Sequence, residues 1–176
     1  MKRAMTIGLA TGVILSLIFI GAGLLRHSVP DTTIAQQLFF YGLFLLMTFS
    51  VFWISLNYFT RSTSARWGIL NVCGLTSSVV AAVIFSVTTY FYTQYIDTTY
   101  LPQLMQQAQQ NYSSASVFKQ GEWTWFKSPY NFALSNFQTS IVLLGIISLL
   151  TSSVYYLMNR NRPDEPVHHR NHELIY

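Results

Sequence analysis

Long apolar runs alternate with short polar segments along this chain, and four of the runs contain no charged residue and no histidine. They cover residues 7–25, 38–58, 68–92 and 137–158. A helix rises about 1.5 Å per residue, so a run of about 20 residues crosses the roughly 30 Å hydrocarbon core of a bilayer. Because lipid offers the backbone no hydrogen-bond partners, such segments must be helical. The pattern predicts an all-α integral membrane protein with four transmembrane helices.

The predicted transmembrane domain occupies residues 1–158, and a cytoplasmic tail follows at 159–176. Its spans lie at about 5–25, 37–58, 67–92 and 136–158, with an outer connection at 93–135. The tail combines prolines and alternating charges with little apolar content, which predicts a flexible segment. The first run, preceded by Lys2 and Arg3 and ending near Gly21-Ala22-Gly23, also fits a signal peptide loosely, but its length favours a span.

Basic residues are divided unequally between the two sides that four alternating spans define. One side holds Lys2, Arg3, Arg61, Arg66, Arg160, Arg162 and Arg170, and the other holds Arg26, Lys119 and Lys127. Loops rich in Lys and Arg stay in the cytoplasm, so both termini are predicted to be cytoplasmic. Trp67 and Tyr155 near one set of helix ends, and Tyr90 and Tyr130 near the other, fit interfacial aromatic belts. The net charge of +4 therefore reflects topology and indicates no binding of nucleic acid.

The outer connection carries a helical period of its own. Asp97 is placed to cap a helix whose first turn tolerates Pro102. The apolar side chains then fall within one arc, with glutamines opposite. This predicts an amphipathic helix that lies against its own bundle or docks a partner. Its apolar face consists of Leu101, Leu104, Met105, Ala108 and Tyr112. After it, Ser128 and Pro129 fit the cap and first position of the last helix, which begins before its apolar run.

Small residues recur at every fourth position in two of the spans. Since lipid tails give helices no hydrophobic reason to associate, close contact between small residues supplies the attraction. We expect these stripes to pack helices within the chain, with a homodimer contact as the alternative. They consist of Gly8, Gly12 and Ser16 in the first span and Gly74, Ser78, Ala82 and Ser86 in the third. Gly145, Ser148 and Ser152 give the last span a looser face of the same kind.

The chain offers few groups for chemistry. Charged residues make up 9% of it, against about 25% in soluble domains. The spans contain none of the ionisable residues that mark proton relays and ion pathways. We interpret Asn57, Asn71, Gln138 and the scattered Ser and Thr of the spans as interhelical hydrogen-bonding groups, and Cys73 as a packing residue. The tail contains His168, His169 and His172, a residue type that binds metal ions. The composition of the tail favours a solvated segment over a metal site. No catalytic, cofactor-binding or metal-binding residue is assigned.

Several segments together resemble a known family. They are Gly8-Leu9-x-x-Gly12, the Arg61 turn, the long amphipathic connection, and Ser128-Pro129-Tyr130-Asn131-Phe132 leading into a last span with Gly145. Over nearly its whole length the chain resembles the four-span bacterial membrane proteins catalogued as domain of unknown function 4199. The resemblance implies a multi-pass protein of the bacterial cell inner membrane and carries over no catalytic residue.

These patterns favour a non-enzymatic accessory or structural protein. Its expected partners are membrane lipids and another protein or further copies of itself. The alternative is a small pore or carrier for an uncharged or lipid-like solute. A membrane enzyme is the least favoured interpretation, since only Asp97, Glu122 or the tail offer acid, base or metal-binding groups near the membrane. A filled bundle favours the accessory role, whereas a continuous wet cavity favours transport.

Overall fold

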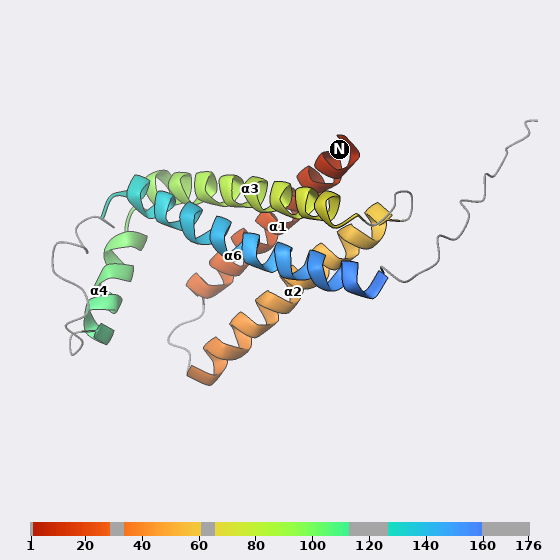
Figure 1. Ribbon diagram of the computed structural model, residues 1–176. Helices are drawn as coiled ribbons and strands as arrows, with labels where there is room; N and C mark the ends of the chain where they lie inside the picture. Colours follow the sequence, from red (N-terminus) through yellow and green to blue (C-terminus); the bar gives the residue numbers. More distant parts are fainter. Residues whose placement is uncertain (1, 29–33, 61–65, 113–126, 160–176) are drawn as a thin grey trace, which may run out of the picture.

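The computed structural model of the protein describes residues 2–28, 34–60, 66–112 and 127–159, without the side chains of 25–28, 34–37 and 107–112. Of the described residues 95% are helical and none lies in a strand. Four helices are long and apolar enough to cross a membrane. They are α1 (Lys2–Ser28), α2 (Ile34–Thr60), α3 (Trp67–Phe91) and α6 (Pro129–Asn159) (Figure 1). The predicted all-α fold with four helices of spanning length is confirmed.

Two shorter helices follow α3. The π-helical turn η1 (Tyr92–Ile96) continues it, and the Asp97 N–H donates to the Tyr92 carbonyl at 2.8 Å. Helix α4 (Tyr100–Tyr112) then points away from the long helices (Figure 1) and occupies the place of the predicted amphipathic helix. The Asp97 carboxylate accepts from the Thr99 N–H at 3.1 Å and the Thr99 hydroxyl at 2.7 Å, so it closes the turn that leads into α4.

The start of α6 follows the Ser128-Pro129 pattern. Proline lacks an N–H, and its fixed φ suits the first position of a helix. Helix α6 begins at Pro129, and the Phe132 N–H donates to the Ser128 carbonyl at 3.0 Å. The last helix therefore starts ahead of its apolar run, as predicted.

Helix α3 is the central element of the fold. It packs along α1 and along α6, whereas α2 contacts mainly α1 and α6 and lies diagonally across from α3. In the apolar 18-residue stretch of α3, 44% is buried inside the protein. The corresponding share in α2 is 11%. Lys2, Arg3 and Arg66 lie at the end where α1 begins and α2 and α6 end, which we call the basic end (Figure 1). The helices are therefore arranged around a ring with α2 as its least covered member.

Two layers of large side chains fill the interior. The layer nearer the basic end contains Ala4, Leu56, Phe59, Leu70, Cys73 and Tyr155. The second contains Leu15, Phe19, Phe52, Ala81 and Leu144. In the second layer the Phe19 ring meets the Phe44 and Phe85 rings edge to face, with centroids 4.6 Å and 5.4 Å apart. Beyond this layer α1 and α2 separate from α3 and α6 toward the end that carries α4 (Figure 1).

The distribution of side chains is the reverse of that in a water-soluble bundle. Large apolar side chains such as Leu17, Leu46 and Leu150 are exposed on the outer surface. Many of the buried residues are small and polar: Thr11, Ser16, Thr48, Ser77, Ser78, Ser148, Thr151 and Ser152. Soluble monomers rarely expose continuous apolar surface of this extent. The arrangement fits a multi-pass protein whose outer surface faces lipid.

Candidate functional site: helix contacts and the α2–α6 cleft

Gly8 and Gly12 bring the backbone of α1 directly against α3. A methyl group on Gly8 would lie 2.8 Å from the Cys73 carbonyl oxygen, and one on Gly12 would lie 2.7 Å from Val80 Cβ. Carbon atoms pack at about 3.5–4.0 Å, so neither position has space for a side chain. Ser16, the third member of the stripe, is buried and donates to the Val13 carbonyl at 2.7 Å. The predicted stripe of α1 thus lies in a contact within the chain.

The stripe of α3 faces a different neighbour. A methyl group on Gly74 would lie 2.9 Å from Ser148 Cβ, so this stripe meets α6. Ser78, Ala82 and Ser86 are buried along the same helix, and the Ser78 hydroxyl donates to the Gly74 carbonyl at 2.9 Å. Helix α3 therefore contacts α1 with one face and α6 with another.

The looser stripe of α6 is only partly used. Ser148 and Ser152 are buried, whereas a Cβ on Gly145 would meet no described atom within 4 Å. Gly145 thus lies beside the contact and outside it.

A contact between α1 and α2 was not predicted from the sequence. The Thr11 hydroxyl donates to the Ile7 carbonyl at 2.8 Å and lies 2.7 Å from the Ser55 hydroxyl of α2. The pair agrees with the interpretation of the scattered Ser and Thr as interhelical hydrogen-bonding groups. Thr11 and Ser55 belong to no small-residue period, so the sequence carried no signal for which partner each would meet.

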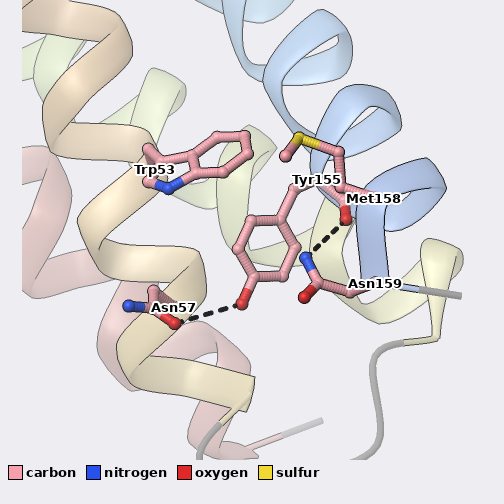
Figure 2. Close-up of a pocket in the computed structure, with 5 residues that line it drawn as sticks. All are labelled: Trp53, Asn57, Tyr155, Met158 and Asn159. Atoms are coloured by element: carbon pink, nitrogen blue, oxygen red, sulfur yellow. Dashed lines mark hydrogen bonds between the residues drawn. The ribbon is translucent and has the colours of Figure 1, made fainter. Parts of the chain in front are cut away.

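A cleft of about 260 Å³ opens between α2 and α6 at the basic end. We call it the α2–α6 cleft. Trp53 and Asn57 line it from α2, and Tyr155, Met158 and Asn159 line it from α6 (Figure 2). All five residues are uncharged, and the described residues place neither an acid–base pair nor a nucleophile with a base in this cleft. Its chemistry is that of hydrogen bonding and apolar contact.

Tyr155 of α6 lines the α2–α6 cleft and links α6 to α2. Its side chain is 3% exposed, and its ring meets the Trp53 ring edge to face at 5.0 Å. Its hydroxyl lies 2.5 Å from the Thr60 hydroxyl and donates to Asn57 Oδ1 at 3.4 Å (Figure 2). The sequence-based interpretation of Tyr155 as an interfacial belt residue was wrong, because the ring is enclosed by α2 and its polar end is satisfied within the protein.

The other polar residues of the spans differ in burial and in whether they form interhelical hydrogen bonds. Asn57 makes the interhelical bond expected of it, whereas Gln138 is exposed. Asn71 is buried, and its Oδ1 accepts no hydrogen bond from the part of the chain that the structure describes. Cys73 is buried in the layer near the basic end, which confirms its packing role. The histidines of the tail lie outside the described residues.

The apolar face of α4 is described in its first half. Leu101 and Met105 are 4% and 9% exposed, and Leu104 is half-buried. The Tyr100 ring contacts the Tyr92 and Phe132 rings at 6.0 Å and 6.2 Å, which joins the start of α4 to η1 and α6. The predicted face also includes Ala108 and Tyr112, whose side chains are not among those that the structure describes.

Comparison with known proteins yields no relative for this arrangement. No protein-family model, no curated protein and no solved structure matches the chain.

Proposed function

We propose that this chain is a non-enzymatic, multi-pass protein of a bacterial inner membrane that acts as an accessory or structural component through a protein partner. The observation that carries the proposal is the close packing of α1, α3 and α6. At Gly8, Gly12 and Gly74 the helices approach until a methyl group has no space. A carrier has to separate its helices around a solute, whereas a scaffold gains from such contacts. The inner-membrane location follows the family resemblance of the sequence.

The proposed partner surface is the outer face of α2. This helix is held along one side only, and Phe39 and Leu46 in its first half are each more than 60% exposed on it. Shape and apolar contact are what such a face offers within a bilayer, where lipid competes for the same surface. Both termini and the basic end are placed in the cytoplasm by the positive-inside rule.

Site-specific photocross-linking in cells of the source organism tests this proposal. A photoreactive phenylalanine analogue at Phe39 or Leu46 is expected to form an adduct with one discrete protein, which also co-purifies in stoichiometric amount in mild detergent. The same analogue at Phe52, which is buried in the second layer, is the matched control and should give no adduct. Lipid adducts alone at both exposed positions would count against a partner on α2.

Transport is tested separately with the purified protein in liposomes. We expect glycerol, an uncharged solute, to cross protein-containing vesicles no faster than empty ones. Protein-dependent flux that disappears in the Gly12→Leu variant would replace the accessory role with the pore or carrier.

A further inference from the structure

The α2–α6 cleft has the size of a site for part of a larger molecule. A water molecule occupies about 30 Å³ in the liquid, so 260 Å³ greatly exceeds a single-water site. It is also smaller than the roughly 300–1,000 Å³ of pockets that enclose a whole drug-sized ligand. The cleft therefore suits a compact group carried on a longer molecule.

The lining offers hydrogen-bond donors on α2. Figure 2 shows no hydrogen bond from the Trp53 indole N–H to another residue of the lining, and Asn57 accepts from Tyr155 through Oδ1, with its amide nitrogen on the other side of the carboxamide. These two residues lie one turn apart on α2, so their side chains are neighbours (Figure 2). The Tyr155 hydroxyl, in contrast, is engaged with Thr60 and Asn57. A matching ligand carries two neighbouring acceptors, and with five uncharged lining residues those acceptors need no charge.

The depth of the cleft narrows the choice of ligand. Asn57 and Trp53 precede Thr60, the end of α2, by three and seven residues, which places them about 5–10 Å from the helix end at 1.5 Å per residue. The polar layer on each side of a bilayer is about 5–8 Å thick. Asn57 thus lies at the edge of the apolar run 38–58, the level expected for the lipid ester carbonyls, and Trp53 lies about one helical turn deeper.

The rim of the cleft provides a path for hydrocarbon chains. Met158, which lines the cleft, is 64% exposed, and Ile54, next to Trp53 on α2, is 66% exposed. The flexible thioether of methionine adapts to irregular apolar partners. Acyl chains leaving the cleft would therefore continue along the uncovered apolar surface of α2.

We infer that the α2–α6 cleft binds the glycerol-ester region of one phospholipid of the cytoplasmic leaflet, with Trp53 and Asn57 donating to its ester carbonyls. The inference rests on the proposed membrane orientation, but it concerns lipid and does not depend on the protein partner. The phosphate group would lie outside the cleft, since the lining has no cation to receive it.

Comparison of an ester lipid with its ether analogue tests the carbonyl contacts directly. The full-length protein is delipidated in detergent and titrated with dioleoyl phosphatidylcholine or with its dialkyl ether analogue, which has the same headgroup but lacks both carbonyls. Native mass spectrometry then counts bound lipids. We expect one diester lipid to be retained and the ether analogue to bind about tenfold more weakly, the size expected for losing one to two hydrogen bonds. Equal binding of the two lipids, or no retained lipid, would overturn the site.

Two variants assign the contacts to the cleft. Trp53→Phe removes an indole N–H while keeping an aromatic ring, and Asn57→Leu removes the amide. Each is expected to lower diester binding several-fold and to leave binding of the ether analogue unchanged. Gln138→Leu removes a carboxamide from an exposed position on α6 outside the cleft and is the matched control. An ester preference that survives in both cleft variants would place the lipid elsewhere and exclude this site, whereas labelling of the two loops (see Discussion) reports independently on the membrane orientation.

Discussion

Gly12 and Gly145 are both glycines inside long helices, but their surroundings differ. A Cβ at Gly12 would lie 2.8 Å from the Ser77 carbonyl oxygen as well as against Val80, and one at Gly145 would meet no described atom within 4 Å. Glycine otherwise weakens a helix relative to alanine by about 0.5–1 kcal/mol. Substitution by alanine at Gly12 therefore measures the cost of disturbing the α1–α3 contact. The same substitution at Gly145 measures only the gain in helix propensity.

Gly12→Ala is expected to destabilise the protein by about 1–3 kcal/mol, because α1 must move away from α3 to accommodate the methyl group. Gly145→Ala, the matched control, should be neutral or slightly stabilising. A thiol-reactive fluorogenic dye measures this well, since Cys73 is the only cysteine and is buried until the bundle opens. If both variants melt at the wild-type temperature in mild detergent, the α1–α3 contact contributes little to stability.

At the scale of the element, α4 is joined to the bundle mainly at its start. The Tyr100 ring contacts η1 and α6, and the apolar side chains of Leu101 and Met105 follow on its buried face. Gln103 and Gln106 lie on the exposed face of the same helix. Burial of one apolar face is what holds a short helix in place, since helices of this length are marginal in isolation.

Replacing Leu101 and Met105 together with serine is expected to release α4. Each buried side chain of this size contributes roughly 1.5–3 kcal/mol, so amide hydrogen exchange over residues 100–112 should accelerate strongly, while the four long helices stay protected. The double change Gln103→Ser and Gln106→Ser removes side chains from the exposed face and should have little effect. Identical fast exchange in the wild-type protein and in both variants would show that α4 is not docked.

At the scale of the whole molecule, the basic end is the feature on which the proposed membrane orientation rests. Figure 1 places the start of α1 and the ends of α2 and α6 together, and Lys2, Arg3 and Arg66 lie there. Lys127 lies at the opposite end, where α6 begins. The positive-inside rule then predicts the basic end on the cytoplasmic side.

Cysteine labelling measures this orientation. In a Cys73→Ser background, a cysteine at Thr98, in the exposed turn between η1 and α4, should react with a membrane-impermeant maleimide in intact cells. A cysteine at Ser64, in the connection between α2 and α3, should react only after the membrane is permeabilised. The reverse pattern would invert the proposed topology, and reaction of both in intact cells would show that the two positions lie on the same side, so that α3 does not cross the membrane between them.

The sequence by itself determined the class of this protein, the positions of its four long helices and the helix in the third connection. These properties depend on the hydropathy and the helical periodicity of each segment taken by itself. The amino-acid sequence contains both. It also identified Gly8, Gly12 and Gly74 as contact residues, because small residues at helical spacing have few other uses in a membrane span.

Only the tertiary structure decided which helices meet. It directs the stripe of α1 against Cys73 and Val80 of α3 and turns the stripe of α3 toward α6. It also encloses Tyr155, a residue typical of the interface, between α2 and α6. Pairing depends on the rotation of each helix about its axis and on the angle at which two helices cross. Neither quantity is contained in the hydropathy of a single span, since every side of such a span is apolar enough to face lipid.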